Sequence, residues 1–418
     1  MPGLAIDRQR LLQRLGELGS LGEVFEGGRT RLALTDADRA ARDLITRWLE
    51  QTGARIHVDR IGNIMAVLPG RSSLAPIMTG SHIDTVVRAG AYDGCYGVIA
   101  AIEVLHAFAA ANVQPEVSVA AAIFTNEEGV RFAPDLLGSR VMAGKLALSE
   151  ALAARDRAGH TVADELARIG YAGSALSDES LPACFLELHI EQGPLLEASN
   201  VQIGVVDALQ GHSWWQVSIE GTANHAGTTP MELRRDAGAA AMVLATEIMQ
   251  AAAQKGTPKV ATVGCISFEP GSINVVPGRA TFSLDMRDHR SDELRRVESM
   301  LLDAAQGLET RGFKVDAKCI SRAEPVTFDG TLCAEIERTA ADLQLTTRRM
   351  VSGASHDAQM MTHLCPSAMI FVPSHRGISH NPAEHTDPDD LLRGAEVLLH
   401  TILRLQTTLG GFDARPAV

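Results

Sequence analysis

Apolar runs and helix-like spacing alternate along the first half of this 418-residue chain. A buried strand is indicated at Glu116–Phe124, which is apolar and partly β-branched. Helices are predicted at Gly94–Ala111 and at Asp36–Gln51, the second with Thr35 or Asp36 as its N-cap. Because helices separate the strands, we expect a mostly parallel sheet covered on both faces. Further strands are predicted at Ile64–Leu68, Ala75–Met78 and Cys184–Leu188.

The pattern changes near Gly211 to the order β-α-β-β-α-β, which is the ferredoxin-like split unit. Its elements are predicted at Trp214–Glu220, Leu233–Ala253, Lys259–Phe268, Arg279–Arg287, Asp292–Gln306 and Phe313–Ile320. The α/β rhythm then resumes with Thr331–Leu343, a strand near Arg348–Val351, His356–His363, Ala368–Phe371 and a closing helix from Pro388.

These elements predict an α/β fold of two domains, as the length of the chain also favours. The larger domain, with a mostly parallel sheet between helices, comprises residues 1–212 and 328–418. A smaller ferredoxin-like α+β domain, residues 213–327, interrupts it, and its size is normal for a domain.

The composition of the chain excludes some classes of partner and indicates the cellular compartment. The formal charge of −13 argues against nucleic acid and against an anionic membrane as partners. The N-terminus shows no signal-peptide pattern, and the longest apolar stretches, such as Gly97–Val104, are too short to span a bilayer. The six cysteines are scattered without CxxC pairs, which is typical of reduced thiols. We therefore expect a cytoplasmic protein.

Histidines and carboxylates gather at or just beyond the predicted strand ends, where ligands bind in such sheets. His82 and Asp84 are two residues apart, so they point to one side of an extended segment, and Asp84 is placed to fix the tautomer of a metal-bound His82. Asp93 precedes a helix, where an aspartate is also common simply as an N-cap.

Glu127 and Glu128 directly follow the buried strand at Glu116–Phe124. Neighbours on an extended segment point opposite ways, so one carboxylate can bind a metal while the other serves as general base. His189 ends another predicted strand, and His380 lies in a late loop rich in glycine and proline. Each segment alone also fits a structural role.

Taken together, the segments supply imidazole and carboxylate ligands without thiolate. That donor set suits two divalent metal ions, Zn²⁺ first, with Mn²⁺, Co²⁺ or Ni²⁺ as alternatives. A bridging aspartate between flanking histidine and glutamate ligands is the arrangement of a binuclear hydrolase.

These segments, in this order, resemble the M20 family of metallo-aminoacylases and peptidases. More narrowly they resemble its hydantoinase/carbamoylase branch, which contains N-carbamoyl-L-amino acid hydrolases, β-ureidopropionases and allantoate amidohydrolases. HIEQGP points to this branch rather than to the peptidases. The resemblance covers essentially the whole chain and rests on GSHIDTV, YDGCYG, FTNEEGVRF, LELHIEQGP, GTANHAGTTPM, INVVPGRATFSLDMR, SGASHDAQ and GISHNPAEHT.

The resemblance implies a role for each matching residue. Asp93 would bridge two metal ions, Glu127 would be the general base, and the small domain would act as a lid and dimerisation domain. His225 would stabilise the oxyanion in the partner subunit's site, and Arg287 would bind the substrate carboxylate by its planar fork. The remaining metal ligands would be His82, His189, Glu128 and His380, and the remaining substrate contacts Gln192, Asn274, Gly353 and Ala354.

Without the resemblance, His225 also fits a turn histidine, and Arg287 a surface ion pair with Asp285 or Asp288. Two positions depart from the family pattern: Ser355 stands where glycine is expected, and His385 is a rival ligand to His380. Both bear on specificity more than on activity.

The function that follows is hydrolysis of an N-carbamoyl-L-amino acid to the L-amino acid, CO₂ and ammonia, by a homodimer acting on a small anionic ureido acid. The alternatives are an allantoate amidohydrolase or β-ureidopropionase and, more distantly, an N-acyl amino acid aminoacylase, a peptidase or a non-catalytic dimer. A serine hydrolase is disfavoured because the chain has no G-x-S-x-G elbow.

Overall fold

The computed structural model describes residues 3–175, 181–253 and 260–409. Its internal contacts divide the chain into two compact units. Unit 1 comprises residues 1–207, 328–350 and 354–418, and unit 2 comprises residues 208–327 and 351–353. The first crossing between the units falls at 207/208, whereas the sequence places it at 212/213.

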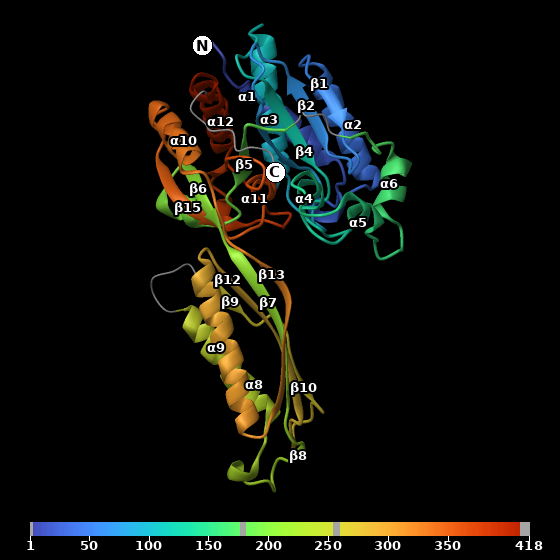
Figure 1. The fold of residues 1–418 in the computed structure, drawn as a ribbon, viewed down its shortest axis with the longest axis vertical. Coiled ribbons are helices and arrows are strands. Elements are labelled where there is room, and N and C mark those ends of the chain that lie inside the picture. The colour runs from blue at the N-terminus through green and yellow to red at the C-terminus, as the bar shows by residue number, and fades with distance from the viewer. Residues whose placement is uncertain (1–2, 176–180, 254–259, 410–418) are drawn as a thin grey trace. The chain divides into compact units, whose positions relative to one another are not determined.

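Unit 1 is built on a mixed sheet (Figure 1). The sheet has nine strands, and one of them, β14, falls within the residue bounds of unit 2. The four central strands run parallel in the order β4, β3, β5, β16. The outer strands β1, β2, β6 and β14 join them in antiparallel pairs. The strands are β1 (Arg55–Val58), β2 (Ile64–Leu68), β3 (Ile77–His82), β4 (Val119–Phe124), β5 (Cys184–Ile190), β6 (Ile203–Leu209), β14 (Val326–Thr327), β15 (Thr347–Ser352), which pairs with β6, and β16 (Ser367–Val372).

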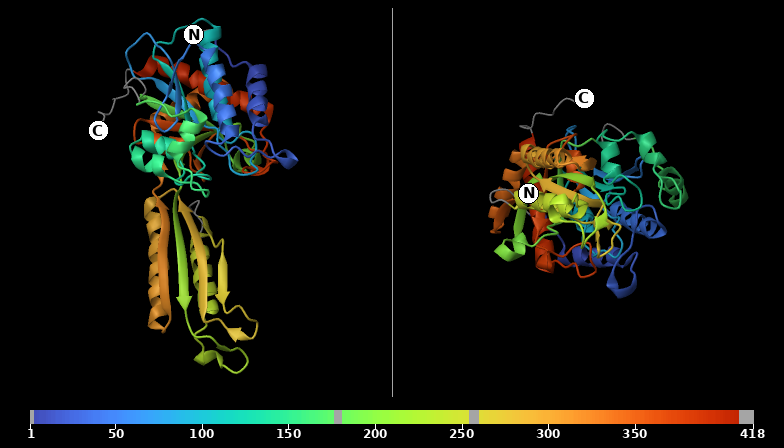
Figure 2. Two further views of the ribbon diagram at one scale, coloured as in Figure 1. Left: turned by 90° about the vertical axis from the view of Figure 1, so that its right-hand side faces the viewer. Right: turned by 90° about the horizontal axis from the view of Figure 1, so that it is seen from below.

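Helices cover both faces of the central strands (Figure 2). Leu188 on β5 lies against Gly394 of α12, while its neighbour Glu187 accepts a hydrogen bond from Ala358 of α11. Adjacent residues of a strand point to opposite faces, so α12 and α11 lie on opposite sides of the sheet. The helices of unit 1 are α1 (Arg8–Ser20), α2 (Asp36–Glu50), α3 (Cys95–Ala110), α4 (Leu137–Met142), α5 (Leu148–Ala153), α6 (Val162–Ile169), α7 (Leu195–Ser199), α10 (Gly330–Asp342), α11 (Asp357–Met361) and α12 (Pro388–Thr408), with 3₁₀ turns η1 (Phe25–Gly27) and η4 (His375–Gly377).

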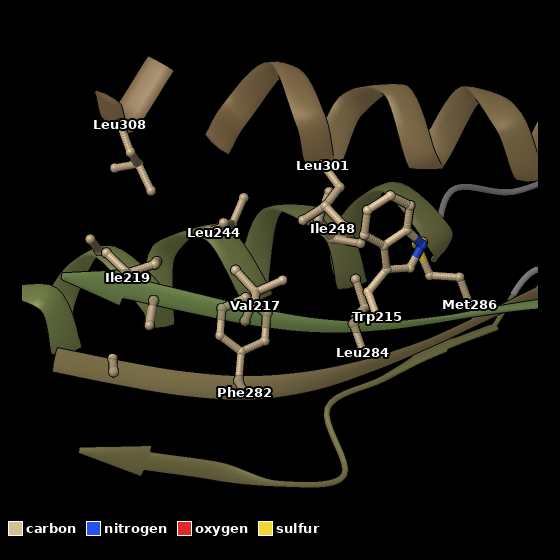
Figure 3. Close-up of a cluster of buried hydrophobic side chains, with 14 of the residues drawn as sticks. Trp215, Val217, Ile219, Leu244, Ile248, Phe282, Leu284, Met286, Leu301 and Leu308 are labelled. Atoms are coloured by element: carbon tan, nitrogen blue, oxygen red, sulfur yellow. The ribbon is translucent and has the colours of Figure 1, made fainter. Parts of the chain in front are cut away.

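Unit 2 is an antiparallel sheet with two helices packed on it (Figure 3). Its core is apolar, with Trp215, Phe282 and Leu301 among the buried side chains. The elements are β7 (Gly211–Glu220), β8 (Asn224–His225), η3 (Met231–Leu233), α8 (Ala237–Ala252), β9 (Val260–Thr262), β10 (Ile266–Glu269), β11 (Val275–Val276), β12 (Arg279–Asp288), α9 (Ser291–Thr310) and β13 (Lys314–Ala323). The strand order β10-β12-β7-β13 and the two helices confirm the ferredoxin-like prediction.

The α/β fold class is confirmed, and the differences from the sequence are local. The strand predicted at Lys259–Phe268 is two strands, because Cys265 leaves the ladder and exchanges hydrogen bonds with Ser283; Lys259 itself lies outside the described residues. Helix α8 begins only at Ala237, because the side chain of Asp236 caps it. The sequence did not predict α1, β1 or β6.

Candidate metal centre

Three parallel strands and one late loop bring the predicted ligands to one edge of the sheet. His82 ends β3, His189 lies near the end of β5, and Glu127 and Glu128 follow β4. The carboxyl ends of parallel strands share an edge, so these side chains converge there. His380 reaches the same place from the loop that follows β16.

Asp93 lies at the middle of this arrangement, and each of its oxygens faces a different set of ligands. Its Oδ1 is 3.2 Å from Nε2 of His189 and 3.7 Å from Nε2 of His82. Its Oδ2 is 2.9 Å from Nε2 of His380, which in turn is 3.6 Å from Oε2 of Glu128. Two groups able to hold a metal ion therefore share Asp93.

Backbone carbonyls orient two of the imidazoles. Nδ1 of His82 lies 2.9 Å from the carbonyl oxygen of Asp84, and Nδ1 of His189 lies 2.9 Å from that of Ile190. A carbonyl can only accept, so Nδ1 carries the hydrogen in both rings. The lone pair of each Nε2 is thereby directed toward Asp93, as a metal ligand requires.

Gly94 allows the ligands to approach this closely. Its φ is +64°, and a Cβ at this position would lie 2.4 Å from the ring of His82. A side chain there would displace the imidazole, so the glycine beside Asp93 is a packing requirement. The backbone N–H of Gly94 also donates to Nε2 of His189 at 3.0 Å.

Asp84 contacts His82 more closely through its backbone than through its side chain. Its carboxylate is 3.9 Å from Nδ1 of His82, while its backbone carbonyl makes the close contact. The carboxylate instead accepts the backbone N–H groups of Glu127 and Glu128, at 3.2 and 3.3 Å. The side chain of Asp84 therefore holds the loop of the two glutamates, while its backbone carbonyl, in the turn after β3, contacts His82.

The carboxyl groups of the centre have pKa values shifted in opposite directions. It raises the pKa of Glu127 and of Glu128 well above the ordinary value, and neighbouring carboxylates raise both further. Burial also opposes ionisation of Asp93, but its interactions with the imidazoles of His189 and His380 outweigh burial and hold the pKa of Asp93 well below the ordinary value.

The donors fit divalent metal ions. The two groups consist of imidazole nitrogens and carboxylate oxygens, which suit Zn²⁺, Mn²⁺, Co²⁺ or Ni²⁺. Oε1 of Glu128 is buried and has no hydrogen-bond partner among the described residues, as expected for an oxygen that awaits a cation. A bound cation would also favour the ionised form of the two glutamates whose pKa is raised.

Glu384 is a positioning residue that the sequence did not reveal. Its Oε1 accepts the backbone N–H groups of Tyr92 and Asp93, at 2.8 and 3.3 Å, and its Oε2 accepts the hydroxyl of Ser379 at 2.7 Å. Glu384 thus joins the segment of Asp93 to the loop of His380. The signal available in the sequence was a lone glutamate within GISHNPAEHT.

Gln192 also contacts the centre. Its Nε2 donates to Oδ2 of Asp93 at 2.8 Å. A second buried group, Glu187, His189 and His356, lies beside the first, and the rings of His189 and His356 are 4.5 Å apart. The sequence assigned no role to Glu187 or His356.

His385 belongs to neither group that includes Asp93. Its ring lies 6.2 Å from that of His375, and its backbone carbonyl accepts the N–H of His375. Of the two rivals, the structure brings His380 to Asp93.

The candidates His225 and Arg287 in unit 2 lie on strands of different sheets, because β8 pairs with β11 and β12 belongs to the larger sheet. His225 is exposed on β8, and the backbone of Asn274 bonds to that of Ala226 close by. Arg287 lies near the C-terminal end of β12, where it pairs with Asp285 at 3.0 Å and donates to the carbonyl of Gly353 at 3.0 Å. The ion pair that sequence alone offered for Arg287 is therefore present.

Similarity to known proteins identifies the family. Residues 78–404 match the model of peptidase family M20/M25/M40. The chain belongs to this family. It is 36% identical to an N-carbamoyl-L-amino acid amidohydrolase of Geobacillus stearothermophilus, over 96% of this chain and 99% of that one, and 34% identical to an allantoate amidohydrolase of Bacillus subtilis, over 93% and 95%.

A solved structure agrees. An amidase of the hydantoinase/carbamoylase family from Burkholderia multivorans matches with a TM-score of 0.92 and 38% identity, over 96% of this chain and 98% of that one. The M20 chain described here is thus an amidohydrolase of the hydantoinase/carbamoylase branch. Within the described residues, no helix combines the length and apolarity that crossing a membrane requires.

Proposed function

We propose that this M20 enzyme uses two divalent metal ions to hydrolyse the carbamoyl C–N bond of an N-carbamoyl-L-amino acid, releasing the L-amino acid, CO₂ and ammonia. The observation that carries the proposal is Asp93, whose two oxygens each face a separate set of ligands. The names of the similar proteins support a ureido or carbamoyl acid as substrate.

In this proposal, Asp93 is shared between the two ions. His82 and His189 complete one site, and Glu128 and His380 complete the other. Bound there, divalent ions would polarise the carbamoyl oxygen and lower the pKa of water. Zn²⁺ is the first candidate, with Mn²⁺, Co²⁺ or Ni²⁺ as alternatives.

Glu127 is the proposed general base. Its Oε2 lies 3.5 Å from Nε2 of His82, so the carboxyl group borders the ligands without belonging to the two groups built on Asp93. Burial raises its pKa well above the ordinary value, and a raised pKa suits a group that must both accept and release a proton. Glu127 would take a proton from the attacking water and pass it to the leaving nitrogen.

Arg287 is the proposed ligand of the substrate carboxylate, because its guanidinium can form two parallel hydrogen bonds to it. It already donates to Gly353, so the backbone of Gly353 and Ala354 would lie near the same carboxylate. Binding would require Arg287 to exchange its ion pair with Asp285. Asn274 and Gln192 complete the proposed substrate contacts.

We also propose a homodimer, in which unit 2 serves as lid and dimerisation domain and His225 acts on the partner's substrate. Two further observations support this arrangement. Arg279 pairs with Glu220, near β8, while Arg287 is eight residues further along β12, about 26 Å at the usual rise per residue. One small substrate cannot meet both Arg287 and His225 of the same unit 2. The outer face of α8 also exposes apolar side chains that a partner would bury: Met242, Val243 and Met249.

The compartment is part of the proposal. All six cysteines are free, and four of them are buried. Unpaired thiols suit a reducing compartment, so we propose that the enzyme works in the cytoplasm.

The nearest alternatives, an allantoate amidohydrolase or a β-ureidopropionase, would use the same ligands and differ in the substrate contacts. The allantoate alternative has a named relative at 34% identity. An aminoacylase or peptidase activity, or a non-catalytic dimer, is the more distant possibility.

The decisive test measures ammonia release by metal-loaded protein. The panel contains N-carbamoyl-L-amino acids, N-carbamoyl-β-alanine, allantoate and an N-acetyl amino acid, the last followed by acetate release. Glu127→Gln should lower turnover by about 10²–10⁴, the usual contribution of a general base, and retain metal. The matched control is Glu116→Gln, an exposed residue that precedes the other end of β4. Metal-loaded protein that is silent on every ureido acid would overturn the proposal.

A further inference from the structure

A cavity of about 560 Å³ opens beside His380 and is not used by the chemistry described above. Two segments line it: the turn after β3, through Val87 and Arg88, and the loop of His380, through Asn381, Pro382 and Ala383. Because His380 belongs to both the cavity and the metal centre, a ligand held at the centre could place a side group in this cavity.

The cavity wall is closely packed. A Cβ at Gly28 would lie 3.0 Å from the ring of Pro382 and 3.2 Å from Cα of Arg88, so the glycine lets these two walls approach each other. Arg88 has a φ of +58°, a left-handed conformation that a long side chain rarely adopts. Backbone held in this way often marks a site where the position of a side chain matters.

The residues that line the cavity suit a ligand with an acidic side chain. Of the described residues that line the cavity, Arg88 carries the permanent positive charge. The side-chain oxygen of Asn381 accepts the N–H of Ala383 at 2.9 Å, so its amide nitrogen is what remains to donate to a ligand. Val87, Pro382 and Ala383 supply apolar surface, which suits a short aliphatic stem.

The positive charge of Arg88 is notable because carboxylates lie at the adjoining centre and the chain as a whole is negatively charged. The adjoining centre contains Asp93, Glu127 and Glu128, and the whole chain carries a formal charge of −13. Metal ions bound at the centre would offset those three carboxylates, but the negative charge of the whole chain would still disfavour a second carboxylate on the substrate unless a local cation compensated it. A guanidinium is the side chain best suited to that task, through its paired donors.

We propose that Arg88 and Asn381 bind the side-chain carboxylate of the substrate, so that the enzyme prefers α-ureido dicarboxylic acids such as N-carbamoyl-L-glutamate and N-carbamoyl-L-aspartate. This inference rests on the proposed function, because it requires a carbamoyl group at the metal centre. It adds a residue that determines specificity.

The test compares kcat/KM for N-carbamoyl-L-glutamate with kcat/KM for N-carbamoyl-L-glutamine, which has nearly the same shape but no side-chain charge. The unmodified enzyme should favour the glutamate by about tenfold or more, the scale of a charge-assisted hydrogen bond that is partly open to water. Arg88→Asn should lower this ratio about tenfold, mainly through KM for the glutamate, because asparagine tolerates the left-handed conformation. Arg88→Glu should lower the ratio further.

Each ratio is measured on one protein, so partial loss of folding does not affect it, and metal content is recorded for every variant. The matched control is Arg71→Gln, an exposed arginine just beyond β2, where Leu68 pairs with Val119 at the opposite end of β4 from the glutamates; its ratio should equal that of the unmodified enzyme. A ratio that Arg88→Asn leaves unchanged, in an enzyme active on neutral ureido acids, overturns this inference alone. Inactivity on every ureido acid overturns the proposed function together with it.

Discussion

In unit 1 the candidate residues His82, Asp93 and His189 are buried and lie within contact distance of one another, whereas in unit 2 His225 is exposed and Arg287 lies on a strand of a different sheet. The interior of unit 2 is apolar, as its core cluster shows. Unit 1 therefore buries a polar centre at a cost in stability, in addition to its apolar core, while the core cluster of unit 2 is apolar.

This contrast suggests how the work is divided. A centre whose ligands already converge needs little rearrangement to bind metal, because its geometry is set by strand ends and carbonyl acceptors. Exposed residues on a separate unit can contribute only when a ligand or a second copy brings their partners to them. Metal binding and turnover should therefore be separable by mutation.

The largest effect is expected for Asp93→Asn. Removing the charge shared by the two ligand groups should lower turnover by at least about 10³, because the oxyanion and the water lose their stabilisation together. Metal content, measured by plasma mass spectrometry after dialysis, should fall below two ions per chain. Asp303→Asn, an exposed aspartate on α9, is the control and should retain both ions. Full metal content in Asp93→Asn would contradict the bridging role.

His225→Ala should lower kcat by about 10²–10³, the usual effect of losing one oxyanion donor, while metal content and thermal stability stay unchanged. The residue is exposed and its ring accepts the backbone N–H of Gly227, so replacing the side chain should leave the fold intact. A loss of metal in this variant would contradict the division between the units.

Mixing separates action within one chain from action across a dimer. His225→Ala and Glu127→Gln subunits are each inactive alone. If His225 acts on the partner's site, a mixed dimer contains one complete site, and an equal mixture should recover about a quarter of full activity, since half the dimers are mixed. No recovery after subunit exchange, with mixed dimers demonstrated, would place His225 in its own chain's site.

The smallest expected effect is on the pH dependence of stability, and it arises from His106, a residue of unit 1. Burial, aided by the charge of Arg14, lowers the pKa of His106 on α3 to about 4. The folded chain thus keeps this ring neutral while the unfolded chain protonates near its ordinary pKa of 6.5. The free energy of unfolding should therefore fall as the pH drops from about 6.5 to about 4, by up to about 1.4 kcal/mol per pH unit for this group.

His106→Gln should flatten that dependence, as urea unfolding at pH 7 and pH 5 would measure. His160→Gln, which alters an exposed histidine, serves as the control. An identical pH dependence in His106→Gln and the unmodified enzyme would show that the acid sensitivity of unit 1 arises elsewhere.

Sequence reasoning succeeded where a general rule fixes position. Parallel strands place their carboxyl ends together, and this rule alone predicts that His82, His189 and the two glutamates lie at one edge of the sheet. The ferredoxin-like order of elements was also predictable, because the hydrophobic periodicity of each segment indicates a helix or a strand. The catalytic and substrate roles of the individual residues stay predictions.

The sequence failed where position depends on how loops approach one another. Nothing in the segment of Glu384 reveals that it accepts the backbone N–H of Asp93, which is 291 residues away. The sequence also did not reveal that the backbone carbonyl of Asp84 contacts His82 while its carboxylate accepts the N–H groups of Glu127 and Glu128. Strand β1 was missed because its residues are partly exposed and lack a clear apolar alternation.

The joining of Asp93 to His380 through Glu384 and Ser379 also has a consequence for biosynthesis. Residues 208–327 intervene in the chain between these partners. A ribosome therefore completes the whole of unit 2 before the last ligand of unit 1 emerges, and the early ligands must wait with their carboxylates unpaired. If two ions bind as proposed, acquisition of the second would show that synthesis has passed the loop of His380.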